Sequence, residues 1–179
     1  RYPHAGTFEI PRLIVNNKQK DARRLIFNAA DADGINASVA ERLSGADFDG
    51  VTVTVIPTKN QKIKTSNPLP GLKDFEPKIK YAKYEGMPEV GVPRKNGGDG
   101  FNKGIQMGQV SNLISDMTLH GADEKELARA ARHSMVVIDA EKHQLNWKQS
   151  EIDNDIRALK KKYQGRENAG ASTLISKAK

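Results

Sequence analysis

The sequence predicts an α+β protein in which a β-rich region comes first, a long basic loop follows, and a helical region comes last. A strictly alternating run, "VTVTVI", occupies residues 51–56, whereas apolar residues recur with helical spacing from Ile105 onward. Alternation with period two is typical of a half-buried strand, and recurrence every three or four residues is typical of an amphipathic helix. The predicted regions are a β region at 1–57, a Pro- and Gly-rich basic loop at 58–104, a helical region at 105–165 and a flexible tail at 166–179.

Three short apolar runs make up the predicted β region. They are "TFEIPRLIVN" at 7–16, "RRLIFNA" at 23–29 and the alternating run at 51–56. The second run is followed by "DADG", whose Asp31, Asp33 and Gly34 are typical turn residues. The β-branched side chains of the third run suit a pleated surface. We therefore expect these runs to form strands.

The predicted loop carries most of the positive charge of the chain. The 179 residues have a net charge of +7, and the stretch 59–95 holds nine Lys or Arg against four Asp or Glu, which is +5. Five prolines and the "NGGDG" run at 96–100 interrupt any regular pattern in the loop. A polyanionic partner such as nucleic acid is one interpretation of the charge. A solvated lysine-rich loop without a partner is the other.

Three helices are predicted in the last region. In the first, Met107, Val110, Ile114 and Met117 share a face. Asp123 and Glu126 resemble a capping box at the start of the second. The apolar stripe of the second helix consists of Leu127, Ala131, Met135 and Ile138. The third is expected to start at Ser150 with Asp153, to stop at Gly165, and to place inward Ile152, Ile156, Leu159 and Tyr163.

Two carboxylates lie close together in "SGADFDG" at 44–50. Asp47 and Asp49 share a face if this segment is extended, because strand residues two apart point the same way. Like charges at this separation repel unless a cation lies between them, and Mg²⁺ is a hard cation that proteins hold with one or two carboxylates plus phosphate oxygens. The alternative is an ordinary solvated turn, because Asp–Gly turns are common.

A longer match bears on this choice. "SGADFDG" resembles the metal-binding loop of the two-barrel RNA polymerases, whose signature D-x-D-G-D lies at the tip of a loop in a double-psi β-barrel. "RYPH" resembles the R-x-P segment before that loop. "GQVSNLISDMTLHGAD" and "ARHSMVVIDAEKH" resemble the region after it in the RNA-dependent and phage-type single-chain branch. The matching residues there are Gly108, His133, Ser134, Asp139 and Lys142.

This resemblance implies that residues 1–57 form a partial double-psi-like barrel and that the chain is a fragment or subunit of a Mg²⁺-dependent RNA polymerase. Asp47 and Asp49 would be the catalytic metal ligands. Val51 replaces the third acid of the signature, so weak or no activity is expected from the chain alone. The implied partners are template and RNA product, nucleoside triphosphates, and a second barrel domain or subunit.

Nucleic-acid contacts are expected from the basic loop and from the positions that match the family. These residues are Arg1, Lys59, Lys62, Lys64, Arg94, Lys95, His133 and Lys142. His133 and Lys142 would face the channel that holds template and product. The alternatives are a packed or hydrogen-bonded structural histidine and an ordinary surface lysine.

Composition excludes some classes of protein. The chain has no run of 18 apolar residues, so no membrane span is expected. It has no cysteine, which removes disulfides and thiolate metal sites and fits a reducing compartment; we expect the cytoplasm of a bacterial or phage-infected cell. Two other functions fit the pattern: a non-catalytic nucleic-acid-binding module derived from such a polymerase, and a phage structural or assembly protein.

Overall fold

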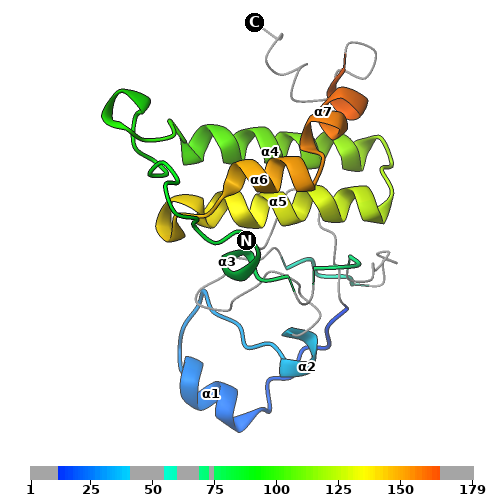
Figure 1. Cartoon of the computed structure of the whole chain (residues 1–179). Coiled ribbons are helices and arrows are strands. Elements are labelled where there is room, and N and C mark those ends of the chain that lie inside the picture. The colour runs from blue at the N-terminus through cyan, green and yellow to red at the C-terminus, as the bar shows by residue number, and fades with distance from the viewer. Residues whose placement is uncertain (1–11, 41–54, 60–68, 73–74, 166–179) are drawn as a thin grey trace, which may run out of the picture.

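A computed structural model describes residues 12–40, 55–59, 69–72 and 75–165, and the part it describes is helical. Helices α4 and α5 lie side by side and antiparallel, and the shorter α6 and α7 pack against them (Figure 1). Earlier in the chain are α1, α2, α3 and the 3₁₀ helix η1. The bounds are α1 Lys20–Ile26, α2 Ala37–Ala40, α3 Pro77–Lys80, η1 Arg94–Asn96, α4 Lys103–Leu119, α5 Glu124–His143, α6 Trp147–Asp153 and α7 Ile156–Gln164.

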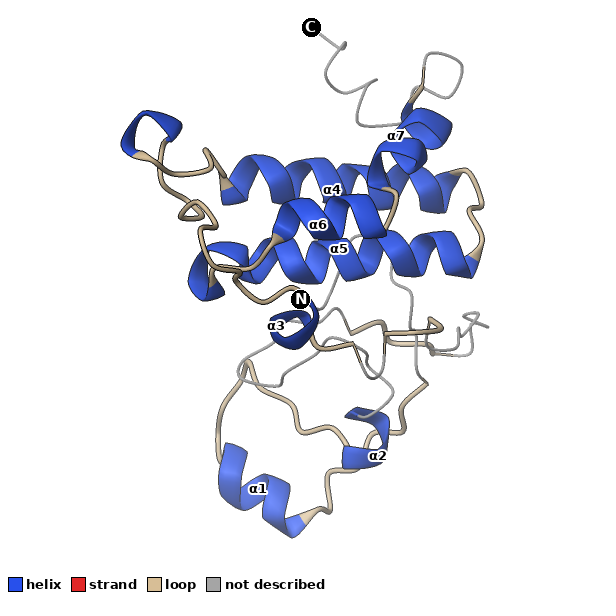
Figure 2. Ribbon diagram, viewed as in Figure 1, coloured by secondary structure: helices blue, strands red, loops and turns tan. Residues whose placement is uncertain are grey.

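The predicted α+β fold is wrong. No strand occurs in the described ranges, where the β pairing consists of one isolated bridge between Glu89 and Gly98 (Figure 2). The "RRLIF" run that we expected to be a strand lies largely in α1, which begins where the Gln19 side chain accepts a hydrogen bond from the Asp21 backbone N–H. A short apolar run suits a strand or a helical turn equally well, and here the helix start decides.

The resemblance to the two-barrel RNA polymerases is overturned by the same finding. Residues 12–16 and 55–56, which belong to the other two predicted strands, have no regular secondary structure, so a double-psi barrel does not fit the helical chain. The second barrel domain or subunit, which only this resemblance implied, stays a prediction. The remaining residues of those two runs lie outside the described part.

The helix faces predicted from periodicity are confirmed for α4, and for α5 apart from Ile138, which is half-buried and joins neither core cluster. Val110, Ile114 and Met117 are at most 2% exposed and form one core cluster with Ala131 and Met135 of α5. Asp123 caps α5, because its side chain accepts a hydrogen bond from the Glu126 N–H at 2.9 Å. Spacing and capping are local properties, so they carry over directly from sequence to structure.

The predicted third helix is two helices. α6 starts earlier than expected, because Asn146 caps it by accepting from the Gln149 N–H at 3.2 Å. The chain then breaks at Asn154 and Asp155, where Asp155 has φ 54°. Asn and Asp tolerate this left-handed conformation better than most residues. The break changes the register of the apolar face, which leaves Ile152 68% exposed although the residues of α7 expected inward are buried.

Residues before α4 pack firmly on the helices. Tyr81, Val90 and Phe101 are at most 5% exposed and form a second core cluster with Val136 and Leu145, among others. Burial of large apolar side chains holds this segment against the α5–α6 junction. Residues 81–101 of the predicted basic loop are therefore held in place by the core.

Candidate nucleic-acid interface

The loop between Pro88 and Phe101 is tied to the end of α5 by one side-chain amide. Gln144, at the C-cap of α5 with φ 52°, accepts from the Val90 N–H at 2.9 Å and donates to the Val90 carbonyl at 3.2 Å. The side chain thus pairs with Val90 as a neighbouring strand would. Both backbone groups of Val90 are satisfied, which a buried peptide unit requires.

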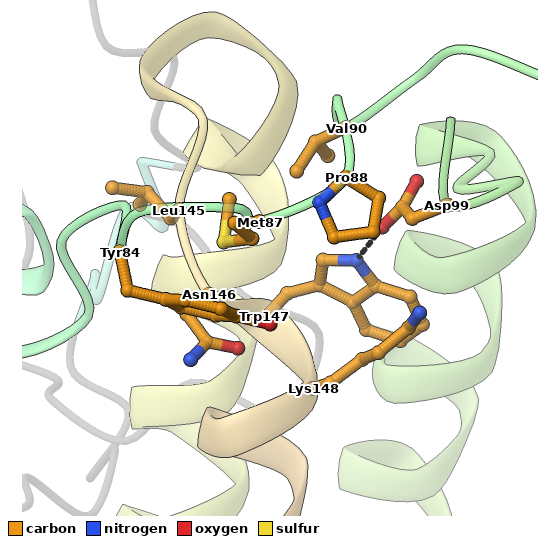
Figure 3. Close-up of a pocket in the computed structure, with 9 residues that line it drawn as sticks. All are labelled: Tyr84, Met87, Pro88, Val90, Asp99, Leu145, Asn146, Trp147 and Lys148. Atoms are coloured by element: carbon orange, nitrogen blue, oxygen red, sulfur yellow. Dashed lines mark hydrogen bonds between the residues drawn. The ribbon is translucent and has the colours of Figure 1, made fainter. Parts of the chain in front are cut away.

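A second tie joins this loop to α6. The indole Nε1 of Trp147 donates to Asp99 Oδ2 at 2.6 Å, while Asp99 Oδ1 accepts from the Phe101 N–H at 2.8 Å (Figure 3). The rings of Phe101 and Trp147 lie 5.2 Å apart, centroid to centroid. A charge-assisted hydrogen bond and a ring contact together hold both segments in one geometry.

The tip of the loop is closed by glycines and carries η1. The Gly100 N–H donates to the Val92 carbonyl at 3.0 Å. Gly98 lies so close to Val92 that a Cβ added there would be 2.1 Å from the Val92 carbonyl oxygen, so the residue has to be glycine. Arg94 and Lys95, two of the predicted nucleic-acid contacts, are exposed in η1 on this closed tip.

Further cations lie at the same end of residues 75–165, which we call the helical unit. In Figure 1 the η1 loop, the start of α4 and the junction of α5 with α6 all lie at one end, and the segment after Tyr81 is joined to that junction by the hydrogen bond from the Asn146 N–H to the Tyr81 carbonyl. We call this end the basic corner; its exposed cationic residues are Lys83, Arg94, Lys95, Lys103, Lys142 and Lys148. The acids of the same segments are Glu85, Glu89, Asp99 and Glu141, of which Asp99 is buried. None of the six cations forms an ion pair with another described residue.

Two cations on and beside α7 are engaged differently. Lys162 Nζ lies 2.8 Å from Glu126 Oε1, and Arg129 Nη1 lies 3.5 Å from Asp155 Oδ2. Glu126 also accepts a hydrogen bond from the Tyr163 hydroxyl. The bonds from Lys162 and Tyr163 lower the pKa of Glu126, and the bond to Glu126 raises the pKa of Lys162. These charges join α5 to α7, so they are less available to an external anion than those of the basic corner.

A shallow hollow lies between the loop and α6. Its lining includes Tyr84, Met87, Leu145, Trp147 and Lys148 (Figure 3). The hollow measures about 30 Å³, which is room for one or two water molecules. Small-molecule sites are usually ten times larger, so this hollow does not hold a nucleotide.

His133 lies inside the protein. It is 3% exposed, and its Nδ1 lies 3.0 Å from the hydroxyl oxygen of Ser150, which is fully buried. Asn154 Nδ2 continues this network by donating to the Ser150 carbonyl at 2.9 Å. Burial, with a smaller contribution from the charge of Lys160, lowers the pKa of His133 to about 4. This geometry favours the structural interpretation of His133 over contact with a template.

The structure brings together only some of the predicted site residues. Arg94, Lys95 and Lys142 lie at the basic corner, and Lys59 is exposed elsewhere in the chain. Lys83 and Lys103 belong to the predicted basic loop but were not named as individual contacts, and Lys148 was not predicted. A signal for Lys148 existed in the sequence, because it follows the single tryptophan of the chain and a basic residue beside an aromatic one is typical of nucleic-acid surfaces.

The predicted metal ligands Asp47 and Asp49 lie outside the described residues, as do Val51, Arg1, Lys62 and Lys64. Within the ranges that the structure describes, no group of three or more His, Asp or Glu side chains is placed to hold a metal ion. In that same part of the chain, no helix has the length and apolar character needed to cross a membrane. The Mg²⁺ site at Asp47 and Asp49 stays a prediction.

Comparison with known proteins adds no further constraint. The chain matches no protein-family model, no curated protein and no solved structure. The geometry of the basic corner is therefore the feature from which a function is proposed.

Proposed function

We propose that this chain is a non-catalytic nucleic-acid-binding module whose basic corner contacts the phosphate backbone. The observation that carries the proposal is the set of exposed cations without ion-pair partners in the described part, at one end of the helical unit. Each phosphate neutralised by Lys or Arg releases condensed counterions, which is a main source of affinity for nucleic acids.

The anchoring of the loop supports the same function. Arg94 and Lys95 lie on a loop that Gln144 and Trp147 hold in place. A cationic loop that is ordered before binding loses less conformational entropy when a ligand arrives than a flexible one does. The corner is therefore better suited to binding phosphate than a freely moving lysine-rich loop of the same composition.

Two predictions from the sequence remain open beside this proposal. Phosphoryl transfer would require the Mg²⁺ site at Asp47 and Asp49, and no described residue of the basic corner supplies a metal ligand set for such chemistry. We also propose a cytoplasmic location in a bacterial or phage-infected cell, since the charge and the absence of cysteine fit a nucleic-acid partner in a reducing compartment.

A matched pair of double variants tests the proposal. Binding of a fluorescent 20-base-pair duplex is measured by anisotropy over a range of salt concentrations. Lys95→Ala with Lys148→Ala removes two charges from the basic corner, whereas Lys125→Ala with Lys161→Ala removes two exposed charges from other parts of the helical unit. The corner variant is expected to reduce the slope of log affinity against log salt by about 2, because each phosphate contact contributes about 0.9.

The control pair decides the outcome. If both variants change the slope equally, the charge of the whole protein and not the corner causes binding. If the unsubstituted protein shows no salt-dependent binding and instead forms a stable oligomer in sedimentation, the proposal is wrong and an assembly role is supported.

A further inference from the structure

We infer that the basic corner selects single-stranded nucleic acid by stacking an unpaired base on the ring of Tyr84. This inference rests on the proposed function, because the cations of the corner would hold the phosphates on either side of that base. It adds the class of nucleic acid and the residue that recognises it.

Tyr84 differs from the other aromatic residues of the helical unit. Its side chain is 53% exposed, whereas Tyr81, Phe101 and Tyr163 are at most 6% exposed. Trp147 is half-buried, and so is the remaining ring, Phe75. Residues 75–165 bury or half-bury their other large rings and keep this one in water, where an apolar ring face has no favourable contact until a ligand covers it; outside this range Phe27 of α1 is also exposed.

The position of Tyr84 is set by backbone hydrogen bonds. The Met87 N–H donates to the Tyr84 carbonyl at 3.1 Å across a turn in which Gly86 has φ 77°. The Asn146 N–H donates to the Tyr81 carbonyl at 2.9 Å, which joins this segment to the start of α6. The ring is therefore presented from a turn that is held at both sides.

One cation neighbours Tyr84 in the chain and another lies near it in space. Lys83 immediately precedes Tyr84 in the chain, and Lys148 lines the same hollow as Tyr84, with its Nζ 5.7 Å from the centre of the Trp147 ring (Figure 3). Exposed aromatic faces between Lys or Arg side chains are the recurring design of single-strand binding surfaces, in which rings stack on bases and cations contact the backbone.

The size of the hollow excludes binding of a base inside it. A space of about 30 Å³ is too small to accept a base flipped out of a duplex. A base must therefore stack on the exposed outer face of the Tyr84 ring. In a duplex, both faces of every internal base are already covered by its neighbours. Stacking on the Tyr84 ring therefore adds little binding free energy for a duplex.

The test compares three ligands and two substitutions of Tyr84. The ligands are a 12-nucleotide oligothymidine, the same strand with abasic sites, and a 12-base-pair duplex. Tyr84→Ala is expected to weaken oligothymidine binding by about tenfold, within the range observed for loss of one stacked base, and to leave abasic-strand and duplex binding unchanged. Tyr84→Phe keeps the ring face and is expected to bind like the unsubstituted protein. Trp147 is the single tryptophan of the chain, so its fluorescence reports binding beside the ring without a label.

Leu119→Ala provides the control, because Leu119 is 70% exposed at the far end of α4. The inference is wrong if the unsubstituted protein binds oligothymidine and the abasic strand equally, or if Tyr84→Ala weakens all three ligands to the same extent. In either case salt-dependent binding persists and the proposed function stands. Absence of binding to all three ligands would instead remove both.

Discussion

The buried His133 makes a prediction about the stability of the protein at mildly acidic pH. Burial lowers the pKa of this imidazole from 6.5 to about 4, so the folded protein holds it neutral while the unfolded chain binds a proton more readily. The stabilisation is fully present above pH 6.5 and is lost as the pH falls from 6.5 towards 4. Protonation would put a charge beside the buried hydroxyl of Ser150, in a network without a carboxylate partner among the hydrogen bonds of His133.

The size of the effect follows from the two pKa values. Each unit of difference corresponds to about 1.4 kcal/mol, so the interval between 6.5 and about 4 corresponds to roughly 3 kcal/mol in total. About 2 kcal/mol of this is lost between pH 7 and pH 5. For a domain with a free energy of unfolding of 5–15 kcal/mol, that change is large.

Urea unfolding at pH 7, 6 and 5, followed by circular dichroism, measures the loss. The lowered pKa of Glu126 makes its own contribution only as the pH falls through and below 4.5, so the range above pH 5 isolates the histidine. His133→Gln keeps a hydrogen-bonding group near Ser150 but does not titrate. Whatever its effect on absolute stability, this variant is expected to flatten the dependence of the free energy of unfolding on pH. His120→Gln, at an exposed position, is the control. A parallel loss of stability in His133→Gln and the unsubstituted protein between pH 7 and pH 5 would contradict the role given to His133.

Two other substitutions follow from the structure, and one metal test follows from the sequence. Gly98→Ala is expected to destabilise the protein by about 2 kcal/mol in urea unfolding, because the added Cβ collides with the Val92 carbonyl oxygen; an unchanged midpoint would contradict this. Gly108→Ala, at an exposed position in α4 with open space around it, is expected to stabilise by about 0.5–1 kcal/mol, and a loss of stability would contradict the helix. If Asp47 and Asp49 hold Mg²⁺, adding the ion raises the melting temperature, and Asp47→Asn removes the rise; equal melting curves with Mg²⁺ and with EDTA would end the metal prediction.

The anchoring of the basic loop was beyond sequence reasoning. Val90 and Gln144 are 54 residues apart, and Asp99 and Trp147 are 48 apart, yet hydrogen bonds join each pair. No local pattern marks such partners, because the contacts form only when the helices have packed. The sequence showed that the chain is basic, but which cations share a surface depends on this packing.

Local signals determined the parts of the protein that were predicted correctly. The apolar spacing along α4 and α5 and the cap at Asp123 depend on residues at most four positions apart, and they appear in the structure as expected. Tertiary structure decided the rest: the helical conformation of the "RRLIF" run, the break at Asp155, and the gathering of distant cations at the basic corner. The physical reason is range, since periodicity and capping act within one turn of helix, whereas the choice between strand and helix for a short apolar run depends on what packs against it.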